Sequence, residues 1–132
     1  MSLTDRQAFE AVFANLTAGG IAHHFGLRGS TGVREDNLNA YKRTAKAAGT
    51  TRWVGTHVGS DDCGGGRWGR DGRLYYRNRF GEDIAEDEVF WSFPMEYPEV
   101  AEYLVYAFRE QGIKVDWTGN VADCVVVTLA DA

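Results

Sequence analysis

The residues with the greatest chemical potential gather in one glycine-rich stretch, "SDDCGGGRWGRDGR", at positions 60–73. Asp61, Asp62 and Cys63 follow His57 closely, and all four are ligand types that zinc or a harder cation uses. Their spacings match neither a closed zinc site nor the alternating oxygen ligands of a calcium loop. The four residues are therefore weak candidates for metal ligands, and the sequence predicts no bound metal or cofactor.

Thiol chemistry is the second kind of reaction that this stretch suggests. Cys63 needs only a base within hydrogen-bond reach to act as a nucleophile, and His57 is close in sequence. An enzyme built here would use His57, Asp61 and Cys63 as its candidate catalytic residues.

The same stretch has a simpler interpretation as a connection between two strands, predicted at 51–58 and 73–80. Three consecutive glycines and the Asp71-Gly72 turn signal are typical of a long hairpin connection that needs no chemistry. Trp68 lies between Arg67 and Arg70 in this connection. A tryptophan in such a place either folds back onto the body of the domain or contacts a partner.

Charge is distributed in two poles along the chain. Residues 28–79 hold eleven Lys/Arg against five Asp/Glu, whereas residues 80–132 hold two against twelve, within a net charge of −5. The poles can neutralise one another inside the fold, or the acidic pole can attract a basic partner. The candidate contact carboxylates are Glu82, Asp83, Glu86, Asp87 and Glu88. Nothing in their spacing sets two of them at the distance of a general acid/base pair.

Three further patterns are weaker. "FGLRGSTG" before a predicted helix is typical of a phosphate cradle, but it lacks the Lys of a nucleoside-triphosphate loop. His23 and His24 are adjacent on a predicted strand and should point to opposite faces, one buried and one exposed. Arginines interleaved with aromatic residues at 67–80 are typical of single-strand binders. The large acidic pole would repel a nucleic-acid backbone, so we do not expect nucleic-acid binding.

The elements that must position these residues follow from capping and periodicity. Thr4 and Gln7 have the spacing of a capping box, and Asp36 or Asn37 is expected to cap the second helix. The predicted helices span 4–18, 35–48 and 98–111, and the predicted strands span 21–25, 51–58, 73–80, 88–93, 113–117 and 123–129. This order predicts an α+β domain, a mostly antiparallel sheet with about three helices packed largely on one face.

Length and composition set the remaining expectations. The chain of 132 residues is expected to form one domain. No apolar run reaches the roughly 18–20 residues of a membrane span, and the N-terminus does not have the pattern of a secretory signal. Cys63 and Cys124 are far apart in sequence, which favours two reduced thiols and a cytoplasmic protein.

Three stretches, "AGGIAHHF", "DGRLYYRNRFG" and "EYLVYAFREQGIKVDWTGN", together resemble a family of small, mostly actinobacterial, bacterial domains of unknown function. They cover under a third of the chain. The resemblance implies the α+β layout and no activity. Members of that family often carry a CxxC-like pair after the first strand, which this sequence does not have, so no metal or redox role is carried over.

These observations favour a binding domain without catalysis. The expected partner is another protein with a basic surface, contacted through the five carboxylates at 82–88 and through Arg67, Trp68 and Arg70. By analogy of size and charge, such a domain is similar to inhibitors, immunity-type proteins or phage-borne anti-defence adaptors. The alternative is a metal- or thiol-dependent enzyme using the 57–63 loop. A third hypothesis is self-association of the opposite poles into a homo-oligomer.

Overall fold

The computed structural model describes residues 4–25, 34–57, 66–77, 80–85 and 88–129. Within these ranges the helices are α1 (Asp5–Ala18), α2 (Arg34–Ala47) and α3 (Pro98–Glu110). The strands are β1 (Ala22–His24), β2 (Trp53–His57), β3 (Gly66–Trp68), β4 (Leu74–Arg77), β5 (Asp83–Ala85), β6 (Glu88–Ser92), β7 (Lys114–Asp116) and β8 (Val125–Thr128). The strands form a five-stranded sheet and a smaller three-stranded sheet.

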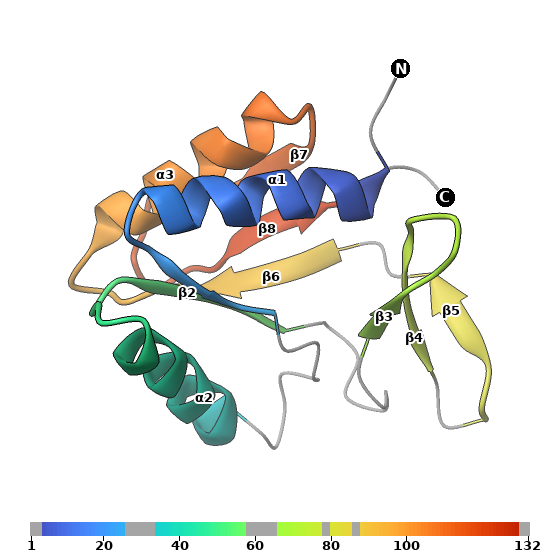
Figure 1. The fold of residues 1–132 in the computed structure, drawn as a ribbon, viewed down its shortest axis with the longest axis horizontal. Helices are drawn as coiled ribbons and strands as arrows, with labels where there is room; N and C mark the ends of the chain where they lie inside the picture. The colour runs from blue at the N-terminus through green and yellow to red at the C-terminus, as the bar shows by residue number, and fades with distance from the viewer. Residues whose placement is uncertain (1–3, 26–33, 58–65, 78–79, 86–87, 130–132) are drawn as a thin grey trace.

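The five-stranded sheet has the order β1-β2-β6-β8-β7. β1 and β2 are parallel, as the crossover through α2 requires, and every other pair in this sheet is antiparallel. α1 and α3 lie side by side on one face, and α2 covers the other face at β1 and β2 (Figure 1). The predicted α+β class with a mostly antiparallel sheet is confirmed, and two of the three helices share a face.

α1 begins at the predicted capping box. The backbone N–H of Gln7 donates to Thr4 Oγ1 at 3.2 Å, and the backbone N–H of Thr4 donates to Gln7 Oε1 at 3.0 Å. These reciprocal bonds satisfy backbone donors that a helix start leaves without partners. The helix then buries Phe9, Val12 and Leu16 against the sheet.

The main core lies between the α1/α3 layer and the five-stranded sheet. Its largest side chain is Trp91 on β6, which is fully buried. The indole is surrounded by the rings of Phe9, Phe13, Phe25 and Phe108. Among the described residues, Trp91 Nε1 is the buried side-chain donor without a hydrogen-bond acceptor. A buried donor left unpaired costs about 1–3 kcal/mol, which this aromatic packing must offset.

A second, smaller core lies under α2. Tyr41 and Ala45 of α2 pack against Ala22 of β1 and Trp53 of β2. The ring of Tyr41 lies directly over Gly55, where an added Cβ would collide with it. α2 begins at Arg34, so the predicted caps at residues 36 and 37 were wrong because both residues lie within the helix.

The three-stranded sheet, β3-β4-β5, corrects the predicted hairpin. The strands expected at 51–58 and 73–80 do not pair with each other. β2 pairs with β1 and β6 in the large sheet, whereas β4 pairs with β3 and β5 in the small one. Residues 66–68, expected to belong to a loop, form a strand because β4 supplies a partner for them.

A tight turn at residues 69–72 joins β3 to β4 and docks on the start of α1. The backbone N–H of Gly69 donates to Arg73 O at 2.7 Å, and that of Arg6 donates to Gly72 O at 3.0 Å. Gly72 has a φ of 79° and lies against the side chain of Thr4. Only glycine adopts this conformation at low cost, so the turn is fixed against the helix start.

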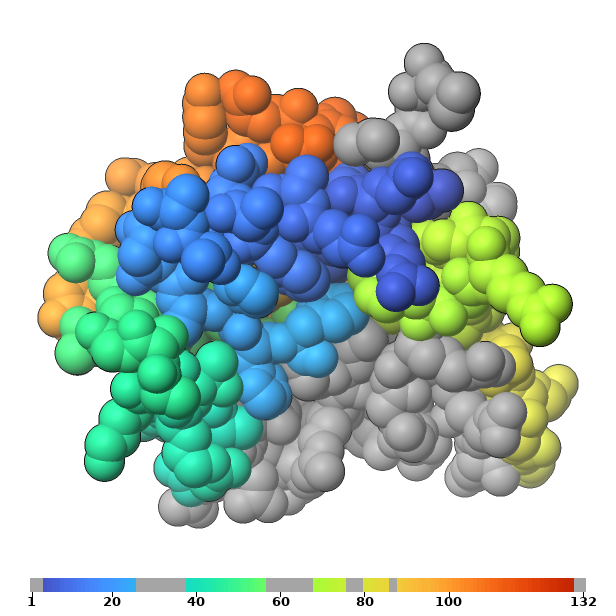
Figure 2. All heavy atoms as spheres, viewed as in Figure 1, coloured from blue at the N-terminus to red at the C-terminus, as the bar shows by residue number. Residues whose placement is uncertain are grey.

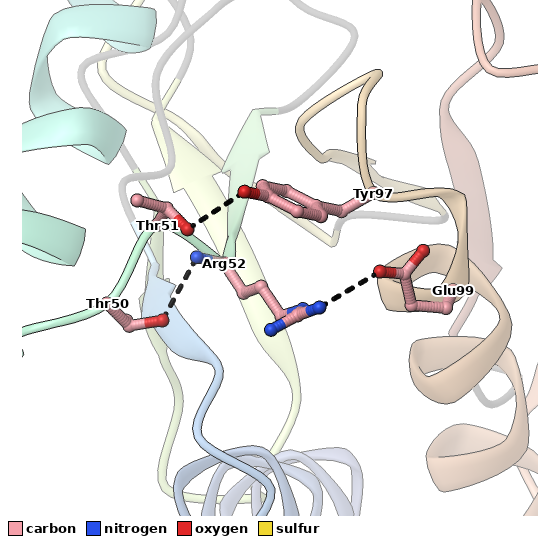
Figure 3. Close-up of polar contacts among 5 residues, drawn as sticks. All are labelled: Thr50, Thr51, Arg52, Tyr97 and Glu99. Atoms are coloured by element: carbon pink, nitrogen blue, oxygen red, sulfur yellow. Dashed lines mark hydrogen bonds and ion pairs between the residues drawn. The ribbon is translucent and has the colours of Figure 1, made fainter.

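The chain before β2 contacts the start of α3 through a small polar cluster (Figure 3). The guanidinium of Arg52 lies 4.7 Å from the ring centroid of Tyr97, and its Nη2 is 3.3 Å from Glu99 Oε1. Thr51 Oγ1 donates to the Tyr97 hydroxyl at 3.3 Å. Because Arg52 and Glu99 are exposed, their ion pair contributes at most about 1 kcal/mol. The cluster joins two elements and contains no catalytic arrangement.

Candidate interaction surface

The candidate metal and thiol residues lie mostly outside the described part of the chain. Asp61, Asp62 and Cys63 belong to the residues that the structure does not describe, and so does the side chain of His57. The backbone of His57 ends β2, opposite Phe90 on β6. Within the described ranges, no three His, Cys, Asp or Glu side chains gather closely enough to hold a metal ion.

Cys124, the other cysteine, is a half-buried free thiol just before β8. Its Sγ lies 3.9 Å from Ser92 Oγ on the neighbouring strand β6. This is a weak hydrogen bond between two partly covered groups, so the contact is structural.

Trp68 folds back onto the main core. Its indole stacks on Phe25, with centroids 5.6 Å apart and planes 10° apart, and meets Phe9 edge-on at 5.3 Å. Trp68 is half-buried and packs against the core cluster, so most of its surface is covered by the fold. Arg70 is exposed in the turn beside it. The side chain of Arg67 lies outside the described part, although its backbone pairs with Tyr75.

Hydrogen bonds hold the turn next to Trp68. The Tyr75 hydroxyl donates to Asp71 Oδ2 at 2.6 Å, and the backbone N–H of Arg73 donates to Asp71 Oδ1 at 3.1 Å. These bonds lower the pKa of the Asp71 carboxyl, and the first of them raises the pKa of Tyr75. Both carboxylate oxygens of Asp71 therefore accept hydrogen bonds that stabilise the turn.

The acidic segment lies at one end of the molecule. Glu82, Asp83 and Glu88 are exposed, and Glu86 and Asp87 lie outside the described residues. Asp83 begins β5. In the described part of the chain β5 pairs with β4 on one side only, so it is an edge strand of the small sheet. Figure 2 shows β5 in yellow at the margin of the molecule, on the opposite side from α2. Glu82 and Asp83 thus lie at an edge strand of the small sheet, and Glu88 lies at the first residue of β6 in the large sheet.

Two apolar side chains accompany these carboxylates. Phe80 is 75% exposed just before β5, and Ile84 within β5 is 37% exposed. We call the group of Phe80, Glu82, Asp83, Ile84 and Glu88 the acidic edge. Phe80 and Ile84 were not predicted from the sequence as part of the partner surface. The signal that could have indicated them is the presence of an aromatic and an aliphatic residue among carboxylates.

The two adjacent histidines point to opposite faces of β1, as predicted. His23 stacks on Phe13 at 4.7 Å on the α1 side, and His24 Nδ1 lies 3.0 Å from Thr44 Oγ1 on the α2 side. Both are half-buried, so the expectation of one buried and one exposed histidine was wrong. Burial lowers the pKa of each, with the charge of Arg43 adding to the effect on His24. Both histidines act as packing residues between a helix and the sheet.

The predicted phosphate cradle at 26–32 lies outside the described residues. None of the helices in the described part of the chain is both long enough and apolar enough to cross a membrane. No known family model, curated protein or solved structure matches this chain.

Proposed function

We propose that this chain acts by binding another protein, one with a basic surface, through the acidic edge. The observation that carries the proposal is the combination of Phe80, 75% exposed, with the exposed carboxylates of Glu82 and Asp83 at an edge strand and of Glu88 at the start of β6. Large exposed aromatic groups among charges are typical of contact surfaces rather than of a surface that only faces water.

The parts of the acidic edge have complementary roles in such binding. The carboxylates attract Lys and Arg on the partner and speed the encounter, because fields of one sign steer association. Phe80 and Ile84 supply apolar area that leaves water when the partner docks. The backbone of β5 adds a third contribution, since a partner segment can extend a sheet by pairing along an edge strand.

The proposed class is that of small acidic binding proteins that act on a partner without chemistry, such as inhibitors, immunity-type proteins and phage-borne anti-defence adaptors. The net charge of −5 supports this class. We propose the cytoplasm as the site of action, and the free thiol of Cys124 supports a reducing compartment.

The test is affinity capture from a lysate of the organism of origin, followed by titration with the purified captured protein. The probes are the wild-type chain and the variant Glu82→Lys/Glu88→Lys. The matched control, Glu96→Lys/Glu110→Lys, makes the same change in charge at two exposed carboxylates on and before α3. A second matched pair compares Phe80→Ala with Met95→Ala, since Met95 is 61% exposed.

The proposal expects a protein that the wild type and both controls retain and that the two acidic-edge variants lose. The same order must hold for dissociation constants of the purified pair. Retention by all five proteins alike, or loss in the controls as well, would contradict a contact through the acidic edge.

A further inference from the structure

The edge of the large sheet at β7 carries a self-complementary pattern. Lys114 and Asp116 are exposed on one face of the strand, and Val115 between them is 3% exposed and faces the core. Ile113 and Trp117, the residues next to β7, are half-buried and pack on the same core. Residues 113–117 therefore alternate apolar and charged side chains symmetrically about Val115.

We propose that two copies of this chain form a dimer by antiparallel pairing of β7 with β7 of the second copy. A two-fold axis at Val115 places Lys114 opposite Asp116 of the second copy, and Asp116 opposite its Lys114. On the helix side, Ile113 lies opposite Trp117 of the second copy. Charges of opposite sign that face each other across an antiparallel pair stabilise it, and so do apolar side chains that face each other. The two five-stranded sheets become one continuous sheet with an isologous contact.

The position of α3 on the sheet fits the same two-fold axis. The Tyr103 hydroxyl donates to Asn15 O at 2.8 Å, which marks the flank of α3 that faces α1. Helical spacing puts Val105 on the other flank, with Arg109 and Glu102 beside it and turned toward solvent. α3 packs on β7 and β8, so this flank lies toward the free edge of the sheet. Val105 is half-buried, and Glu102 and Arg109 are exposed.

Pairing at β7 brings these flanks together. Strands are about 4.8 Å apart, so helices centred over β7 and β8 in each copy come to lie roughly 10 Å apart, a normal packing distance. The two α3 helices are antiparallel about the axis, and Glu102 of one copy lies on the same level as Arg109 of the other. Within the described part of the chain, Glu102, Arg109, Lys114 and Asp116 form no ion pair. Dimer formation supplies each with an opposite charge.

Most of the acidic edge lies on and before β5, in the other sheet, whereas Glu88 begins β6 and shares with Lys114 the pairing partner Thr128 on β8. Phe80 and Glu82 lie outside the large sheet, so variants at these positions test the partner contact alone, and variants at 114 and 116 test the dimer.

The test is sedimentation equilibrium with single and double charge variants. The wild type is expected to reach twice the 14.6 kDa of the chain as concentration rises toward about 1 mM, the weak end of specific association. Lys114→Asp and Asp116→Lys each replace two attractive pairs by two repulsive ones, so each should raise the dimer dissociation constant by roughly tenfold or more. The double variant Lys114→Asp/Asp116→Lys restores both attractive pairs and should dimerise like the wild type.

Mixing the two single variants gives the sharpest result. One carries two aspartates and the other two lysines at these positions, so the mixture should form a heterodimer where neither variant forms a homodimer. Circular dichroism checks that each variant is folded. A wild type that stays at the monomer mass at every concentration overturns the proposal, and so does dimer formation that the single variants leave unchanged.

Discussion

The indole of Trp68 and the ring of Phe25 are stacked nearly parallel, 5.6 Å between centroids and 10° between planes. Trp68 comes from the small sheet, whereas Phe25 directly follows β1 of the large sheet. The stack therefore joins the two sheets, and the Arg6–Gly72 backbone bond joins the small sheet to α1 at a second point. These contacts hold the acidic edge in a fixed place on the body of the protein.

Removing the indole should destabilise the whole domain. Trp68→Ala deletes contacts with both Phe9 and Phe25, and we expect the free energy of unfolding to fall by about 2–4 kcal/mol. Urea denaturation followed by circular dichroism measures it. The matched aromatic control is Phe80→Ala, which should stay within about 0.5 kcal/mol of the wild type because the ring is mostly exposed. Equal losses in the two variants would mean that Trp68 does not join the sheets.

Gly55 and Tyr41 should show strong coupling. Gly55→Ala places a methyl group against the Tyr41 ring and is expected to cost about 1–3 kcal/mol of stability. The cost should nearly vanish when Tyr41→Ala has already removed the ring. A double-mutant cycle of unfolding free energies measures the coupling, and additive costs would refute the contact.

The Tyr41 hydroxyl provides an independent check on the packing of α2. It donates to Thr56 O at 2.8 Å, and burial, with the nearby Cys124 adding, raises its pKa to about 12. We expect one of the six tyrosines to ionise later than the others in a spectrophotometric titration, and Tyr41→Phe to remove that late step. If Tyr106→Phe removes the late step and Tyr41→Phe does not, the late ionisation does not belong to Tyr41.

The histidines should make stability depend on pH. Burial lowers the pKa of His23 and His24 below 6.5 in the folded protein, whereas the unfolded chain keeps the ordinary value. The unfolded chain therefore binds more protons as the pH falls through 6.5, and the free energy of unfolding falls with it. The decrease ends below the folded pKa values. Urea unfolding at about pH 7.5 and about pH 5.5 should show a smaller difference in His23→Gln/His24→Gln than in the wild type. An unchanged difference would exclude these two residues as its source.

Local signals in the sequence predicted much of the fold. Thr4 and Gln7 determine the start of α1 through bonds three residues apart, and the apolar stripe of α3 needs only helical spacing. β3 and β5 have three residues each, and Gly66 and Asp83 are unusual in strands. These strands form because β4 lies between them. That pairing depends on the tertiary structure, which is also why β2 and β4 were wrongly placed in one hairpin.

The candidate site was also predicted only in part, because the exposure of some of its residues depends on the tertiary structure. Runs of carboxylates such as Glu82 and Asp83 are visible in the sequence, and they are exposed as charge requires. The different fates of Trp68 and Phe80 are not visible there. Both are aromatic residues beside glycine and charge, and only the packing of Phe9 and Phe25 decides that one is covered and the other exposed.

Binding through the acidic edge is tested most directly by the affinity for the captured partner as a function of salt, measured by isothermal titration. The wild type should lose affinity as sodium chloride rises, since its carboxylates attract a basic surface. Glu82→Lys/Glu88→Lys should weaken binding by about tenfold or more at low salt and flatten this dependence, while Glu96→Lys/Glu110→Lys keeps both. Equal affinity and equal salt dependence in all three proteins would contradict binding through the acidic edge.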